Sequence, residues 1–252
     1  MKTEFHCHSC YSFDSSLDLN VILKRCIQLG INNIVICDHD IFGLSKDELR
    51  SFSDAAITVL KAIEFTSNEG IHIIGMGEEI KKIEMPAFHY SAINLIRILK
   101  QHEFFICLPH PTHSTGVIGN KSSDTHLIEF CMSAAHFVEA NNLRYGKTDD
   151  LDFYLQKYPN LKAIVGSDAH RASEVGRFFT ISPGIYPKDS VHETENILKI
   201  IYDMPIHKND KSKRGKIYFF SRMLQTTKLY QFVLNLFPPK WRRNVRKFFR
   251  LI

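Results

Sequence analysis

The chain has 252 residues, of which 44% are hydrophobic and 23% charged, as is usual for a globular protein with a sizeable core. Its apolar runs all fall short of the roughly 20 residues that span a bilayer, which argues against a transmembrane helix. The six scattered cysteines indicate reduced, buried side chains rather than a disulfide framework. Because the first predicted strand begins at Thr3 and leaves no room for a signal peptide, we expect a cytoplasmic protein.

The net charge of +5 is unevenly distributed. Residues 207–252 contain 13 Lys and Arg against one acidic residue, a balance of +12, whereas residues 1–206 contain 19 basic and 26 acidic residues, a balance of −7. We therefore predict two parts, a folded domain over residues 1–206 and a basic tail over residues 207–252.

Within the first part, short apolar runs alternate with longer amphipathic ones, which favours an α/β fold with parallel strands. In chain order, the predicted strands are residues 3–8, 33–37, 57–65, 71–75, 104–108, 137–140 and 163–166. The predicted helices are residues 17–29, 44–52, 91–101 and 149–158. Gly30 is expected to end the first helix, and Gly70 to provide a turn before residues 71–75.

Histidines and acids cluster at the predicted strand ends. His6 and His8 share one face of the first strand, because alternate side chains of a strand point the same way. Asp168 and His170 have the same spacing at the far end of the domain. In a β/α barrel the carboxyl ends of the strands meet at one face, so distant residues would share one pocket. The pattern predicts a site for several metal ions.

The order of these motifs is specific. HxHxxxxxD is followed by DH, IE, IHIIG, PHP and GSDAH, and this series resembles the PHP (polymerase and histidinol phosphatase) family over roughly residues 1–180. The resemblance implies a distorted seven-stranded (β/α) barrel, here with a basic helical C-terminal extension. It also implies hydrolysis of phosphate esters with two or three divalent ions (Mn, Zn or Fe).

Carried over by motif, the resemblance implies three ion sites. The first would be held by His6, His8, Glu64 and Asp168. The second would share the bridging Glu64 and add His72 and His110. The third would lie among Asp14, His39 and His170. Imidazoles suit Zn, Mn or Fe, and carboxylates can bridge two cations.

Such ions, about 3.5–4 Å apart, can hold a hydroxide and clamp the attacking and leaving oxygens of a phosphoryl transfer. We therefore expect attack of a metal-bound hydroxide on phosphorus. With the third site empty, His39 or His170 would instead protonate the leaving group. Arg171, directly after the GSDAH motif, is placed to neutralise a substrate phosphate.

The expected function is hydrolysis of a small phosphomonoester or nucleotide. Two alternatives stay open, a phosphotyrosine phosphatase linked to surface polysaccharide synthesis and a metal-binding regulatory module without turnover. Asp14 and the DAH sequence that ends the GSDAH motif favour the family members that act on nucleotides. The basic tail instead favours a phosphatase linked to polysaccharide synthesis.

The tail ends in KWRRNVRKFFRLI, which places apolar and basic side chains on opposite faces of a helix. This pattern is typical of a helix attracted to an anionic membrane surface, which would make the protein peripheral at the inner membrane. It is also typical of a helix that binds nucleic acid, or of one packed on the barrel with a solvated rim.

Overall fold

A computed structural model describes all residues except 84, 142–148, 183–193, 204–206 and 211–252. Its strands are β1 (Lys2–Cys7), β2 (Asn33–Ile36), β3 (Thr58–Thr66), β4 (His72–Met76), β5 (Phe105–Leu108), β6 (Phe137–Asn141), β7 (Lys162–Val165), β8 (Phe178–Ile181) and β9 (His207–Asp210). Its helices are α1 (Leu19–Leu29), α2 (Lys46–Asp54), the short 3-10 helix η1 (Ile80–Lys82), α3 (Ala92–Gln101), α4 (Thr125–Ala134), α5 (Asp149–Lys157) and α6 (Thr194–Asp203).

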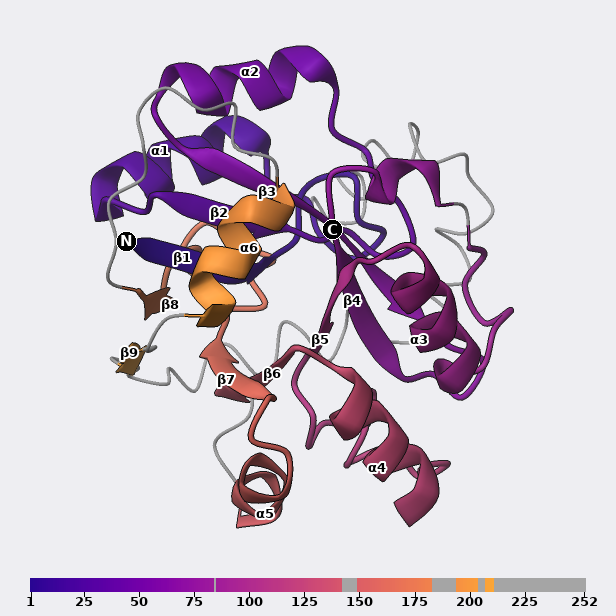
Figure 1. The fold of residues 1–252 in the computed structure, drawn as a ribbon. Helices are drawn as coiled ribbons and strands as arrows, with labels where there is room; N and C mark the ends of the chain where they lie inside the picture. Colours follow the sequence, from indigo (N-terminus) through magenta and orange to yellow (C-terminus); the bar gives the residue numbers. More distant parts are fainter. Residues whose placement is uncertain (84, 142–148, 183–193, 204–206, 211–252) are drawn as a thin grey trace, which may run out of the picture.

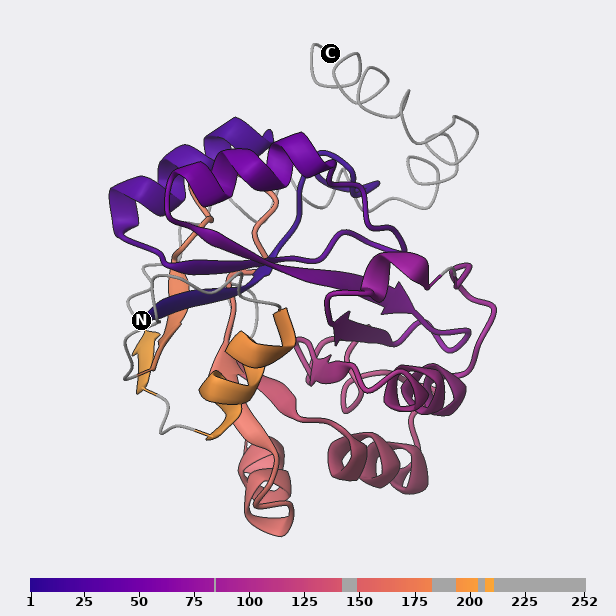
Figure 2. The same ribbon diagram turned by 45° about the horizontal axis from the view of Figure 1, so that its top comes forward.

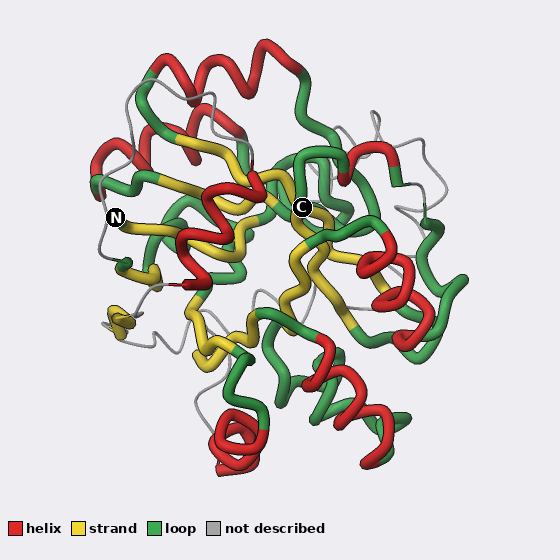
Figure 3. Tube along the Cα trace, viewed as in Figure 1, coloured by secondary structure: helices red, strands yellow, loops and turns green. Residues whose placement is uncertain are grey.

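The described strands form one sheet in the order β7-β6-β5-β4-β3-β2-β1-β8-β9, and Figure 3 shows them grouped inside a surround of helices. The neighbours β1–β2–β3 and β5–β6–β7 run parallel. Strand β4 runs antiparallel to both β3 and β5. The reversal follows from a tight turn in which Gly70 has a φ of 78° and its N–H donates to Ser67 O, a conformation that favours glycine.

The sheet curls until its ends nearly meet, because the chain beyond β7 returns to β1. Ala169 N donates to His6 O at 3.2 Å, and His8 N donates to Ala169 O at 2.9 Å. Beneath this junction the buried Glu4 carboxylate accepts hydrogen bonds from the backbone N–H groups of Ser167 (2.8 Å) and Gly176 (3.0 Å). The result is a nearly closed, barrel-shaped sheet.

Separate apolar clusters fill the inside and the outside of this barrel. The interior cluster includes Phe5, Leu60 and Phe137, and α6 packs Ile197 and Ile201 against it. Outside, α1 and α2 lie beside β1–β3, and α3 and α4 lie beside β4–β6 (Figures 1 and 2). Apolar contacts therefore cover β1 to β6 on both faces of the sheet.

The α/β barrel predicted from the sequence is confirmed, but its strand number is not. The described sheet has nine strands instead of seven, because β8 and β9 add antiparallel beside β1. Four described elements, α4, β8, α6 and β9, were not predicted from the sequence. β9 (HKND) contains no apolar residue that would indicate a buried strand. β8 is formed by pairing with β1, and β9 by pairing with β8.

The predicted tail overlaps the sheet at its start. Residues 207–210 form β9, which pairs with β8, so the sheet extends past the predicted boundary at residue 207. Residues 211–252, with the predicted basic helix, lie outside the described residues. Among the described helices, none combines the length and the apolar character needed to cross a membrane.

Candidate metal centre

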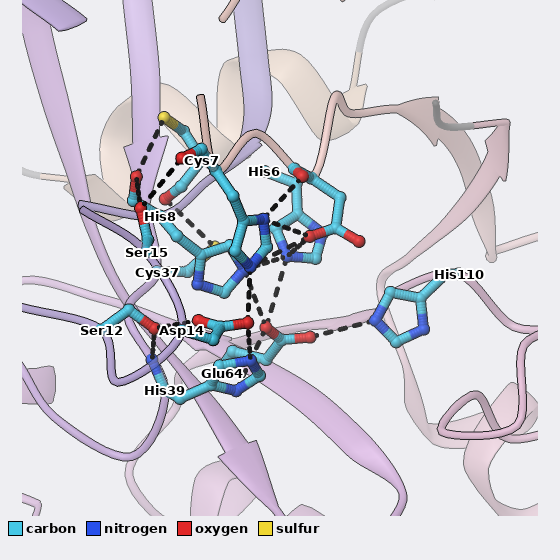
Figure 4. Close-up of polar contacts among 12 residues, drawn as sticks. His6, Cys7, His8, Ser12, Asp14, Ser15, Cys37, His39, Glu64 and His110 are labelled. Atoms are coloured by element: carbon cyan, nitrogen blue, oxygen red, sulfur yellow. Dashed lines mark hydrogen bonds and ion pairs between the residues drawn. The ribbon is translucent and has the colours of Figure 1, made fainter. Parts of the chain in front are cut away.

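The nine residues predicted as metal ligands lie in one connected cluster, and seven of them are buried while Asp14 and His72 are partly exposed. Figure 4 shows six of them, His6, His8, Asp14, His39, Glu64 and His110. His6 and His8 leave the end of β1, and Glu64 lies near the end of β3. His39 follows β2, and its backbone forms an isolated parallel bridge with Glu64. The others come from the loop after β1, the start of β4, and the segments after β5 and β7, in the order Asp14, His72, His110, Asp168 and His170.

Glu64 is the centre of the cluster, because its two carboxylate oxygens face different sets of imidazoles. Oε2 lies 3.1 Å from His8 Nε2 and 3.4 Å from His6 Nε2. Oε1 lies 3.0 Å from His72 Nδ1 and 3.2 Å from His110 Nε2. One buried carboxylate thus joins the residues predicted for the first ion to those predicted for the second.

Asp168 is the second carboxylate predicted for the first ion, and it lies beside the two histidines of that site. Asp168 Oδ1 lies 3.4 Å from His8 Nε2 and 3.6 Å from His6 Nε2. Its own backbone has a φ of 49°, in the left-handed region that non-glycine residues rarely adopt. Backbone strain of this kind concentrates at functional sites.

The residues predicted to hold the third ion, Asp14, His39 and His170, lie next to His8. Asp14 Oδ2 is 2.7 Å from His170 Nε2 and 3.7 Å from His39 Nε2. The ring of His8 stands 4.2 Å from that of His170 and 4.8 Å from that of His39, between centroids. The first and third sets are therefore adjacent.

The electrostatics of the cluster favour bound positive charge. Burial raises the pKa of Glu64, but the imidazoles of His39, His6 and His72 outweigh burial and hold this pKa well below its usual range. Burial lowers the pKa of His39, yet Glu64 and Asp14 outweigh it and raise the pKa to about 10. Burial lowers the pKa of His72 to about 4, which leaves its imidazole neutral and able to coordinate.

The donor chemistry fits divalent ions. The Nε2 atoms of His6 and His8 face one another at 3.0 Å inside the protein, next to the carboxylates of Glu64 and Asp168. Lone pairs of nitrogen and oxygen that converge without apolar separation require a proton or a cation between them, and mixed imidazole and carboxylate sets suit Zn, Mn or Fe.

Two residues near the cluster were not predicted as part of it. Glu139 contacts both His6 and His110 and is buried; it ends a predicted strand, and only its place beside other strand ends could have indicated this. The Cys37 sulfur lies within 4.8 Å of the ligand atoms of His6 and His8. Burial raises the pKa of Cys37 to about 12, which keeps its thiol protonated.

The aspartates that flank His39 hold neighbouring loops. Asp38 accepts hydrogen bonds from the backbone N and Oγ of Ser9, both at 2.6 Å, and thereby fixes the segment after His8. Asp40 accepts from Thr66 N at 2.7 Å, two residues beyond Glu64. Neither caps the following helix, whose capping residue is Ser45.

Arg171 directly follows His170 and is half-buried, and its backbone N donates to Glu174 Oε2 at 3.2 Å. Its role towards a substrate phosphate stays a prediction.

Comparison with protein families agrees with this geometry. The model of the PHP domain matches residues 4–207, a range that contains every residue of the cluster. The chain belongs to the PHP domain family. The family inferred from the order of the motifs is thereby confirmed.

Similar proteins were found by sequence and by structure. A 5'-3' exoribonuclease of Haemophilus influenzae is 33% identical over 94 residues, which make up 36% of this chain and 34% of that protein. The match therefore spans about a third of the relative. A two-domain protein from Bacteroides vulgatus containing a predicted PHP-like metal-dependent phosphoesterase superposes with a TM-score of 0.62 at 16% identity, over 83% of this chain and 64% of that one. The lesion-specific endonuclease PfuEndoQ of Pyrococcus furiosus gives 0.59 at 16% identity, over 81% and 57%. At these identities the two structures show a shared fold.

Proposed function

We propose that this PHP-family protein is a metal-dependent hydrolase of phosphate esters. The observation that carries the proposal is Glu64, whose two oxygens face separate imidazole sets and can join two cations. Divalent ions bound there would supply Lewis-acid activation of water and neutralise charge on the phosphate.

The chain's own residues have distinct tasks in this proposal. The first ion would be held by His6, His8, Glu64 and Asp168. The second would be held by Glu64, His72 and His110. The third would be held by Asp14, His39 and His170. Seven of these nine residues are buried, which strengthens the charge interactions among them.

When no ion is bound among Asp14, His39 and His170, His39 or His170 would protonate the leaving group. Both lie beside Asp14, which stabilises the protonated imidazole. Arg171 is proposed to bind a phosphate oxygen, because it follows His170 at the edge of the same cluster.

The proposed substrate class is a small phosphomonoester or a nucleotide. The names of two similar proteins, an exoribonuclease and a lesion-specific endonuclease, support the nucleotide-directed part of this class. Those names also agree with nucleic acid, rather than a membrane, as a partner of the basic tail. A phosphotyrosine phosphatase and a module without turnover have no such support.

The test uses the full chain, loaded with Mn²⁺ or Zn²⁺ and checked by elemental analysis. It is assayed on an aryl phosphate, nucleoside monophosphates, a 5'-phosphorylated oligonucleotide and a phosphotyrosine peptide. We expect turnover of the first three classes, abolished by His8→Ala and by Asp168→Asn. A metal-replete protein that hydrolyses none of them would overturn the proposal and favour the regulatory module; preference for the peptide would favour the tyrosine phosphatase.

A further inference from the structure

Glu139 is a buried acidic residue outside the predicted ligands, and it contacts one histidine predicted for the first ion and one predicted for the second. It lies in β6, between β5 and β7, and is buried. Its Oε1 accepts a hydrogen bond from His6 Nδ1 at 2.8 Å, and its Oε2 accepts one from His110 N at 2.8 Å.

The first contact sets the tautomer of His6. A carboxylate can only accept, so the Nδ1 atom of His6 carries the hydrogen. The lone pair of the neutral ring is then on Nε2, the atom that faces Glu64 at 3.4 Å and Asp168 at 3.6 Å. A carboxylate behind a metal-binding histidine fixes its orientation and increases its basicity in this way.

The second contact supports a strained backbone. His110 has a φ of 31°, in a region where non-glycine residues are rare. This turn aims the imidazole so that Nε2 lies 3.2 Å from Glu64 Oε1. Because the His110 N–H is held by Glu139, the carboxylate helps to keep the turn in place.

The surrounding chain leaves space for this arrangement. A Cβ atom on Gly166 would lie 2.6 Å from Glu139 Oε1 and 2.7 Å from His6 Cβ. Only glycine at the end of β7 lets the glutamate and the histidine approach, so three strands cooperate in the contact.

We propose that Glu139 is a positioning residue that couples the first two ion sites by holding His6 in its coordinating tautomer and His110 in its strained turn. This inference rests on the metal centre proposed above. Glu139 itself binds no ion in the proposal; it acts through the two histidines. Its loss should weaken both ions together, although the two histidines come from β1 and from the segment after β5.

The test is a metal titration of the full chain without substrate, in which Zn²⁺ is distributed between the protein and a chromophoric chelator. Glu139→Gln keeps the volume but offers one acceptor oxygen in place of two. We expect the affinity for the first two ions to fall about 10- to 100-fold, with the unfolding midpoint of the metal-free protein close to wild type. Glu129→Gln, on a half-buried glutamate of α4 paired with Lys157, should bind Zn²⁺ as the wild type does.

Glu139→Asp provides a second variant, because it retains the charge on a side chain too short for both contacts. It should also lose affinity. Wild-type affinity in both variants would overturn the inference, as would a fall in affinity matched by an equal loss of stability in the metal-free protein. Failure of the wild type itself to bind Zn²⁺ would instead overturn the proposed metal centre.

Discussion

Asp14 Oδ2 and His170 Nε2 lie 2.7 Å apart, although 156 positions separate the two residues in the chain. The loop after β1 and the segment after β7 meet here, directly beyond the junction that Ala169 makes with β1. The coupling of His170 and His39 to Asp14 holds the pKa of this carboxyl well below its usual range, against the burial that raises it. The third set is therefore assembled by closure of the barrel.

Asp14→Asn should selectively weaken the third ion. The substitution removes the charge and leaves the first two sets in place. One charge-assisted contact is worth about 1.5–3 kcal/mol, so we expect a fall in affinity of roughly 10- to 150-fold for that ion. Equilibrium dialysis with elemental analysis measures it, with the exposed Asp47→Asn as control. An unchanged ion count at limiting metal would contradict the assignment.

Gly166→Ala should disturb both packing and metal binding. The added methyl group would meet Glu139 and His6 at distances that real Cβ atoms essentially never show. Overpacking of this kind typically costs about 1–3 kcal/mol. Urea denaturation of the metal-free variant checks the stability, and Ser173→Ala on an exposed serine serves as the comparison. Equal stability of Gly166→Ala and wild type would contradict this prediction, because it would show that Glu139 and His6 move aside at little energetic cost.

His136→Asn should make stability less dependent on pH. Burial, with the nearby Lys100, lowers the pKa of His136 in the folded protein, where Nδ1 accepts a hydrogen bond from Ile106 N at 3.0 Å. Its contribution is therefore full above the unfolded pKa of about 6.5 and is lost as the pH falls below it. Between about pH 7.5 and about pH 5.5, wild type should lose more stability than the variant, by at most about 1.4 kcal/mol per pH unit. Denaturation in the presence of a chelator measures this, and parallel profiles would refute it.

Addition of metal should stabilise the fold. An ion at 100 times its Kd adds about 2.7 kcal/mol to the free energy of unfolding, which corresponds to about 5–11 °C in the unfolding midpoint for a domain of this size. Thermal unfolding with Mn²⁺ or Zn²⁺, and then with excess EDTA, checks both directions. A midpoint that is indifferent to both additions would argue against a metal centre.

Local sequence patterns determined much of this protein. The apolar runs predicted β2 to β7 to within one or two residues, because a buried strand is rich in apolar side chains whatever it pairs with. Gly30 predicted the end of α1, where it adopts a φ of 63°. The spacing of His6 and His8 placed both on one face of a strand, and the order of the motifs predicted the family.

The tertiary structure decided what depends on contacts between distant segments. The addition of β8 and β9 and the junction of Ala169 with β1 arise from hydrogen bonds between distant segments, which no local pattern encodes. Glu139 is the clearest case, since nothing next to it in the chain distinguishes it from a structural glutamate. It acquires its place only when β6 lies beside β5 and β7, because a carboxylate acts on the groups within about 3 Å of it, and the fold selects those groups.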